Sequence, residues 1–533
     1  MRAVLIEVTM WMLCCATAAA APSAPATSEA PALVVAGATA SEQAHPSRAA
    51  TFAAAAENDD AQAIRDLIRT HVDVNAPGPD GTPALQWIVH RQDLGTARQL
   101  IEAGADVNKA NRYGVLPLHL AIANDDAPMV HLLLAAHADV NSADSTGESC
   151  LMMAAGIGDA DIVRALLDRG AVADQRDPHY QQTALMFAAR GGHTEVARLL
   201  LKHGAQVDAQ TRTGEVPKFR SPASNAGSKG AGIIRGGWPE RGERDPIPGA
   251  KTPLLYAARD GHLDTVQLLL SSGAKLEKAD ADGVTPLLMA ILNGHLSMAH
   301  FLIGKGANIN VADWYGETPL WATVDIRDLD IPGPHQGNGV DRAAALELIR
   351  ELLTRGADVN ARTKEYPPQR RWITRLGSLS WVDFTGQTAF IRAALAGDLE
   401  VMHLLLDHHA DPNIETFNGT TALMAAAGVN WTVAQTYDEG PAKLLEAVKL
   451  AQSLGNDVNA VNAMGLTALH GAANRGSDDI IRFLAEHGAR LELADKQGRT
   501  AMTWAQGVFL ATHPPEVKPT TIALLKELQG GTS

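Results

Sequence analysis

The side chains most able to do chemistry in this chain are its 19 histidines, yet their spacing matches no catalytic or metal motif. The sequence contains no H-E-x-x-H helix, no G-x-S-x-G elbow and no Walker loop for phosphates. His408 and His409 are adjacent, but they lack the cysteine or the spaced second ligand that a zinc site needs. We therefore expect no catalytic residue, no metal and no cofactor.

Four aspartates and one cysteine are further candidates, for a calcium site and for a reactive thiol. Asp325, Asp328, Asp330 and Asp341 could offer oxygen ligands to calcium, but their spacing does not match an EF-hand loop. A solvated acidic loop is the simpler interpretation. Cys150 lies in an apolar run without a basic neighbour, which predicts a buried and unreactive thiol.

Two segments combine positive charge with aromatic side chains. Segment 213–250 is rich in glycine and, with one flanking residue at each end, holds eight basic and four acidic residues. Segment 365–384 is also basic. Trp, Tyr and Arg dominate binding energy at protein interfaces. The candidate partner-binding residues here are Trp238, Arg235, Arg241, Arg370, Arg371 and Trp372. The alternative, in which the segments fold back onto the chain with their rings inward, stays open, above all for Trp381 and Phe384.

Further aromatic candidates occur in turn motifs such as the one at 313–316. Tyr113, Trp314 and Tyr315 lie in such turns, where an exposed ring indicates a contact surface. The alternative, that each ring packs against the neighbouring turn, stays open as well.

The composition indicates what kind of molecule must position these residues. Hydrophobic residues make up 46% of the 533 residues, which excludes a fully disordered chain. A net charge of −15 argues against a general nucleic-acid binder, which needs a basic face. Aromatic residues make up only 5%, so alanine and leucine must fill most of the interior.

The N-terminus has the features of a secretory signal at 1–21. Arg2 precedes an apolar stretch at 8–18, and three alanines at 18–20 fit a cleavage site. The stretch is too short for a membrane-spanning helix. We expect export, a periplasmic or secreted location, and no membrane anchor after cleavage. Residues 22–50, rich in Ala, Pro and Ser, are predicted to be a linker.

A repeat runs along the rest of the chain. The second residue of a Thr-Pro-Leu or related motif falls at 83, 117, 150, 184, 253, 286, 319, 389, 422, 468 and 501. Seven of the ten steps are 33 or 34 residues, and three are longer because of insertions. Threonine is a good N-cap, and proline is tolerated at the first helical position. Each unit then predicts a short Ala-rich helix, a turn, a Leu-rich helix ended by glycine, and a tight hairpin.

These units resemble ankyrin repeats. The segments 116–121 and 467–470 come closest to the family's T-P-L-H-x-A. The resemblance implies an all-α solenoid with β-hairpin fingers, which binds proteins through its fingertips and concave inner helices. About eleven units follow a degenerate one at 51–79. The expected organisation is repeats at 51–212, 251–364 and 385–496, insertions at 213–250, 325–341, 365–384 and 430–442, and a capping repeat at 497–533.

The function expected from this pattern is a non-enzymatic, monomeric scaffold for partner proteins, of an exported bacterial type. Each repeat is expected to contact only its neighbours. Two alternatives stay open. One is an enzyme or a binder of small anions, with Arg235, Glu240, Arg241, Arg370 and Arg371 converging from the basic insertions. The other is a secreted effector that binds a host protein.

Overall fold

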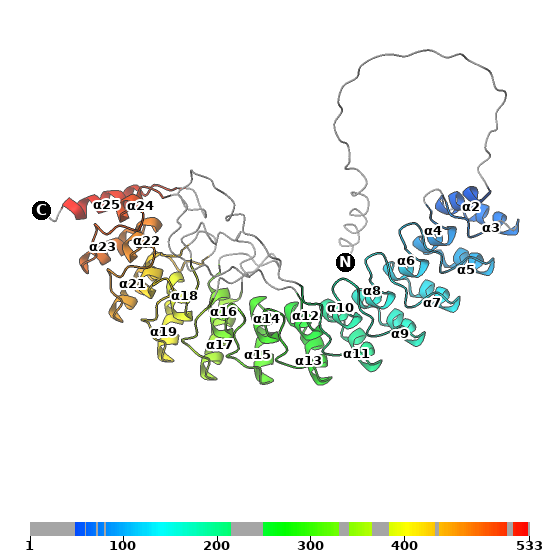
Figure 1. Cartoon of the computed structure of the whole chain (residues 1–533), viewed down its shortest axis with the longest axis horizontal. Helices are drawn as coiled ribbons and strands as arrows, with labels where there is room; N and C mark the ends of the chain where they lie inside the picture. Colours follow the sequence, from blue (N-terminus) through cyan, green and yellow to red (C-terminus); the bar gives the residue numbers. More distant parts are fainter. Residues whose placement is uncertain are drawn as a thin grey trace, which may run out of the picture. The chain divides into compact units, whose positions relative to one another are not determined.

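The helices of the computed structural model come in consecutive pairs (Figure 1). The residues that the structure describes are 48–58, 60–70, 73–78, 81–214, 249–329, 340–364, 383–431, 436–508 and 515–530. The first helices of the pairs are α2 (Arg48–Glu57), α4 (Ala84–His90), α6 (Pro117–Ala123), α8 (Cys150–Ile157), α10 (Ala184–Gly191), α12 (Pro253–Arg259), α14 (Pro286–Leu292), α16 (Pro319–Arg327), α18 (Ala389–Ala396), α20 (Ala422–Ala427), α22 (Ala468–Arg475) and α24 (Ala501–Ala505). The second helices are α3 (Ala61–Arg69), α5 (Leu94–Glu102), α7 (Ala127–Ala135), α9 (Ala160–Asp168), α11 (Thr194–Lys202), α13 (Leu263–Ser271), α15 (Leu296–Gly304), α17 (Arg342–Thr354), α19 (Leu399–Asp407), α21 (Pro441–Ser453), α23 (Asp478–Glu486) and α25 (Pro519–Gly530).

Threonine caps explain where the first helices begin. The hydroxyl of Thr252 accepts the N–H of Leu255 at 3.2 Å, and the same bond recurs at Thr285, Thr318, Thr388 and Thr421. Such a cap satisfies a backbone donor that has no partner inside the helix. Two boundaries differ from the prediction. Helix α4 begins at 84, one residue after the expected proline, and α2 begins at 48, inside the predicted linker.

The even-numbered helices form one layer of the stack and the odd-numbered helices form the other (Figure 1). Each even-numbered helix packs against the even-numbered helices before and after it. The hydrophobic core of the stack is built mainly from alanine and leucine of both layers, for example Ala121, Leu133 and Leu200. This agrees with the low aromatic content, because small side chains let neighbouring helices approach closely.

Short turns connect each pair to the next, and we call these turns fingers. The expected β-hairpins are reduced among the described residues to two isolated bridges, Ala143 with Ser149 and Ala494 with Thr500. Side-chain bonds add to the backbone bonds of the fingers. The Asp144 carboxylate accepts the N–H groups of Thr146 and Glu148, at 2.8 and 3.0 Å. In this finger they supplement the bridge between Ala143 and Ser149.

A ladder of asparagines joins consecutive pairs beside the fingers. Asn108 donates to His137 O at 3.1 Å and accepts the N–H of Asp139 at 2.7 Å. Equivalent asparagines are Asn75, Asn141, Asn310, Asn360 and Asn459. Asp174 and Asp208 occupy this position in the middle of the chain, where they accept a bond but have no amide to donate.

Candidate functional site

Tyr113 is a fingertip ring that lies beside a cation and is 60% exposed. The Arg112 guanidinium lies 4.8 Å from its ring centroid and donates to its hydroxyl at 2.7 Å. An arginine beside a tyrosine is a combination that interfaces favour. Sequence reasoning identified Tyr113 but missed Arg112, although the two are adjacent in the chain.

The prediction was wrong for Tyr315, whose side chain is only 2% exposed. Its carbonyl accepts the N–H of Lys364 at 2.6 Å, so the next finger lies directly against it. The ring also packs edge-on against Trp314, with centroids 5.0 Å apart. The alternative of inward packing therefore describes Tyr315, while Trp314 is half-buried. Phe384 is buried too, as its packing alternative expected.

The other predicted contact residues lie outside the described part of the chain. They are Trp238, Arg235, Arg241, Arg370, Arg371 and Trp372. The predicted signal at 1–21 lies outside it as well.

Backbone bonds join neighbouring fingers in the C-terminal half. Trp314 donates its N–H to Asp282 O at 2.8 Å, and the equivalent bonds are Phe417 to Thr385, Ala463 to Asn418, and Lys496 to Met464. At 178 the donor position is a proline, which has no N–H. Within 111–181, no backbone bond joins the finger at 144–147 to either neighbour. The N-terminal fingers therefore have fewer links to one another.

The even-numbered layer is open in the N-terminal half. Trp87 on α4, Leu120 on α6 and Met153 on α8 are half-buried at equivalent positions of successive helices. Ala123 and Ile157, at the ends of α6 and α8, are exposed. These side chains form an apolar strip that a partner can reach. We call it the open strip.

The same layer is closed in the C-terminal half. Every residue of α16, α18 and α20 is buried. Val429 and Asn430, which follow α20, are buried in turn, and a Cβ on Gly471 of α22 would lie 2.6 Å from the Val429 nitrogen. In this half, α16, α18 and α20 therefore present no exposed side chain to a partner.

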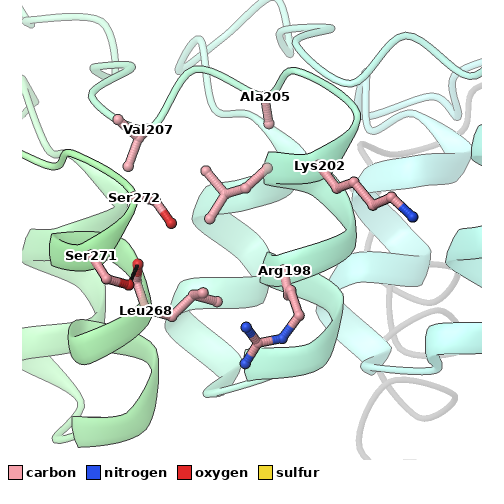
Figure 2. Close-up of a pocket in the computed structure, with 8 residues that line it drawn as sticks. Arg198, Lys202, Ala205, Val207, Leu268, Ser271 and Ser272 are labelled. Atoms are coloured by element: carbon pink, nitrogen blue, oxygen red, sulfur yellow. Dashed lines mark hydrogen bonds between the residues drawn. The ribbon is translucent and has the colours of Figure 1, made fainter.

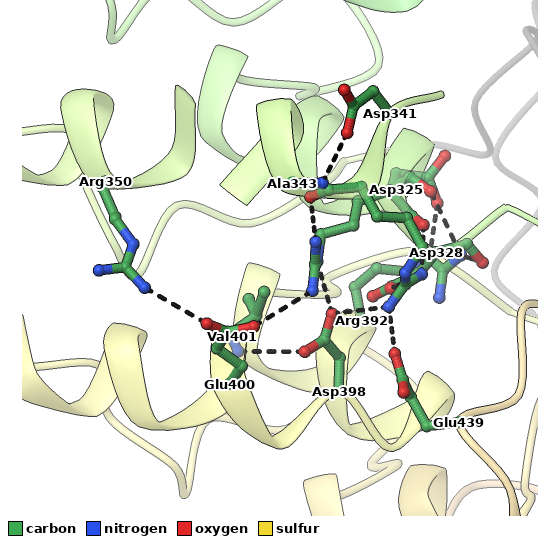
Figure 3. Close-up of polar contacts among 12 residues, drawn as sticks. Asp325, Asp328, Asp341, Ala343, Arg350, Arg392, Asp398, Glu400, Val401 and Glu439 are labelled. Carbon is green, nitrogen blue, oxygen red and sulfur yellow. Dashed lines mark hydrogen bonds and ion pairs between the residues drawn. The ribbon is translucent and has the colours of Figure 1, made fainter. Parts of the chain in front are cut away.

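A cluster of buried charges lies at the C-terminal ends of α16 and α18 (Figure 3). Arg392 binds Asp325 at 2.6 Å, and Arg327 binds Asp398 at 2.7 Å. Arg342 at the start of α17 contacts Asp328, Asp398 and Glu439. We call these seven residues the charge cluster.

The charge cluster corrects one sequence-based expectation. Asp325 and Asp328 do not lie in a solvated acidic loop. Asp325 is the third residue from the end of α16, and Asp328, which follows the last residue of that helix, is fully buried. Burial raises the pKa of Asp328 to about 8, although Arg392 and Arg342 oppose this shift. Its Oδ2 atom and the Nη1 atom of Arg392 make no hydrogen bond.

The charge cluster also links repeats that are not neighbours. Tyr437 and Glu439 precede α21, yet the Tyr437 N–H donates to Asp328 O at 2.9 Å, and the Tyr437 ring lies 4.2 Å from the Arg342 guanidinium. This connection passes over the pair α18–α19. Arg475 on α22 likewise donates to Leu395 O on α18, at 3.4 Å. The expectation that each repeat contacts only its neighbours is therefore wrong here, and we call these links the brace.

A groove of about 470 Å³ lies between α11 and α13, in the odd-numbered layer (Figure 2). Leu201, Val207 and Leu268 line it together with Arg198 and Ser272. The ammonium group of Lys202, which also borders the groove, points away from α13 (Figure 2). A shallow groove with one converging cation gives no support to a small-anion site here.

Two buried histidines and the cysteine have structural roles. Nδ1 of His470 accepts the N–H of Thr467 at 3.0 Å, and its Nε2 lies 3.1 Å from Arg499 O. His119 caps α6 in the same way, and burial lowers the pKa of both rings. Cys150 is buried, which raises the pKa of its thiol to about 11. No described group of His, Cys, Asp or Glu is arranged to hold a metal ion, and no described helix is both long and apolar enough to cross a bilayer.

Comparison with known proteins places this geometry in a family. A model described as ankyrin repeats (3 copies) matches residues 52–144, 118–211, 237–313, 341–435 and 441–508. Among solved structures, the human ASB11 ankyrin repeat domain is similar at 23% identity over 50% of this chain and 96% of that one, with a TM-score of 0.37. Because the family model covers more than half of the residues, the chain belongs to the ankyrin repeat family.

Proposed function

We propose that this chain is a non-enzymatic scaffold that holds a partner protein against its N-terminal half. The observation that carries the proposal is the difference between the two halves of the even-numbered layer. The open strip leaves Trp87, Leu120 and Met153 accessible, whereas α16, α18 and α20 are buried throughout. Ankyrin repeats generally mediate contacts between proteins, and apolar strips framed by polar turns suit that role.

A matched pair of substitutions tests where the partner binds. Ala123 is the last residue of α6 and is exposed on the open strip, while Ala135 is the last residue of α7 and is exposed in the odd-numbered layer. Because both are exposed helix ends, Ala123→Glu and Ala135→Glu should have similar effects on folding. We expect Ala123→Glu to reduce recovery of partners in a quantitative pull-down at least tenfold, and Ala135→Glu to leave it unchanged.

Equal recovery by both variants would remove the open strip as the binding surface. Circular dichroism of each variant shows whether the helices are intact, so that a loss of binding is separated from a loss of folding. A pull-down in which both variants lose partners equally would also contradict the proposal.

We also propose that the scaffold acts outside the cytoplasm, in the periplasm or after secretion. The support is the signal-like sequence at 1–21, with its three alanines at 18–20. Cell fractionation followed by N-terminal sequencing tests this proposal. We expect the mature protein to begin within a few residues of Ala21, and recovery of a cytoplasmic chain that retains Met1 would contradict it.

A further inference from the structure

The fingers at 109–115, 142–148, 175–182 and 209–214 carry four basic and three acidic side chains, in a chain whose net charge is −15. Arg112, Arg176 and Arg212 are all exposed on successive or alternate fingers. No carboxylate is exposed on the fingers at 109–115, 142–148, 175–182 and 209–214. The acidic residues Asp93, Asp126 and Asp159 are the N-caps of odd-numbered helices. They lie at the turns within the helix pairs and not on the fingers between pairs.

The acidic residues of these fingers bond to their own backbone. Asp177 is buried, and its carboxylate accepts the N–H groups of His179, Tyr180 and Gln182. Asp144 does the same within its finger. Burial raises the pKa of Glu148, and Asp144 adds to that shift. The positive charge of Arg190 opposes that shift, so the Glu148 carboxylate and the Arg190 guanidinium attract each other.

The positive surface continues onto the even-numbered layer at α10. The Arg190 guanidinium lies 5.1 Å from the centroid of the Phe187 ring, and Arg190 is exposed and forms no ion pair with any described residue. Phe187 lies over α8, because a Cβ on Gly156 would be 3.4 Å from its ring. The basic fingers and the open strip are thus neighbouring parts of one surface.

A second pair of an arginine and an aromatic ring, Arg362 and Phe417, has a structural role. Arg362 lies 4.4 Å from the Phe417 ring, but its guanidinium donates to the carbonyls of Gly386 and Glu415, which fixes it between fingers. Within the described residues, the Arg112 guanidinium donates to the hydroxyl of the adjacent Tyr113 and lies over its ring. Its remaining donors are available to an incoming carboxylate.

We propose, on the basis of the proposed function, that the N-terminal fingers bind an extended acidic segment of the partner protein. Arg112 and Arg212 belong to the first and fourth of four consecutive fingers, and neighbouring repeats are about 10 Å apart. Arg176, on the third finger, donates to the carbonyls of Gln181 and Gln210, which fixes its guanidinium between fingers. An extended chain rises about 3.3 Å per residue, so carboxylates about three residues apart match the finger spacing. Apolar residues of the same segment would contact the open strip.

The experiment is selection of a displayed library of random 12-residue peptides against the full chain. We expect the selected peptides to be enriched in Asp and Glu, with apolar residues between them. Binding of a selected peptide should weaken about tenfold as salt rises from low to high ionic strength, because exposed charges are screened. It should weaken at least tenfold in the variant Arg112→Glu/Arg190→Glu.

The matched control is Arg198→Glu, because Arg198 is exposed on α11 in the odd-numbered layer. It should bind the peptides as the unmodified chain does. Selection of neutral or basic peptides, a library without binders, or equal binding by Arg112→Glu/Arg190→Glu would each overturn the proposal. The experiment separates the two proposals. If Ala123→Glu abolishes partner binding but Arg112→Glu/Arg190→Glu does not, the open strip is supported and the acidic segment is refuted.

Discussion

At the scale of single residues, Asp328 makes the stability of this protein depend on pH in an unusual direction. Burial raises its pKa to about 8, whereas the carboxyl of an unfolded chain titrates near 3.8. Between these values the folded protein holds one more proton than the unfolded chain. The free energy of unfolding contributed by Asp328 therefore falls as pH rises, by about 1.4 kcal/mol per pH unit.

Replacement of the carboxyl tests this dependence. We expect Asp328→Asn to lose the decline in stability between pH 5 and pH 8, measured by urea unfolding at several pH values. The control is Asp341→Asn, because Asp341 is an exposed N-cap of α17 and asparagine caps helices as well as aspartate does. An unchanged pH dependence in Asp328→Asn would contradict the assignment.

The asparagine ladder supplies a second prediction at this scale. Asp174 accepts the N–H of Gln206 at 2.8 Å but cannot donate, whereas Asn141 does both. Asp174→Asn should add a bond to Gly204 O and raise the free energy of unfolding by about 1 kcal/mol. The reciprocal change, Asn141→Asp, should lower it by a similar amount. Denaturant midpoints measure both, and shifts of the same sign would refute the explanation.

At the scale of helices, the brace makes four consecutive pairs depend on one another. Arg342→Ala removes the ion pairs with Asp398 and Glu439 and the contact with Asp328, and it leaves the Asp398 charge buried with fewer partners, a kind of loss that costs about 3–5 kcal/mol. We expect faster hydrogen exchange throughout α16–α21, and no change in α4–α9. The matched control is Arg350→Ala on the same helix, because its ion pair with Glu400 is exposed and contributes less than about 1 kcal/mol. Equal effects of the two variants would contradict the role of the brace.

The same scale shows what the sequence could and could not predict. The 33-residue period predicts the helix pairs because caps, alanines and leucines act within one unit, as the bond from Leu255 to Thr252 illustrates. The environment of Asp328 could not be predicted, since its partners Arg392 and Tyr437 are 64 and 109 residues away. Tyr113 and Tyr315 occupy similar turns, and only the packing of the next finger makes one exposed and the other buried. An arginine three residues after an aromatic residue lies over the ring in Phe187 and Arg190 and also in Tyr256 and Arg259, a spacing that sequence reasoning did not use.

At the scale of the whole chain, the two halves should unfold differently. In the N-terminal half the contacts between repeats are those of neighbours, and the finger at 144–147 has no backbone bond to either neighbouring finger. In the C-terminal half the brace adds links between second neighbours. We expect α4–α9 to lose protection from hydrogen exchange at a lower urea concentration than α16–α22. Loss of protection at one common concentration would contradict this division.

The brace also limits how this protein can change over generations. Solenoids commonly gain or lose whole repeats, because a unit with identical neighbours can be duplicated or deleted without altering any other contact. Deletion of α18–α19 would instead carry Tyr437 away from Asp328 and remove Arg392 and Asp398 from the charge cluster. The number of units between α16 and α22 is therefore fixed, while the N-terminal half stays free to lengthen or shorten and so to match partners of different size.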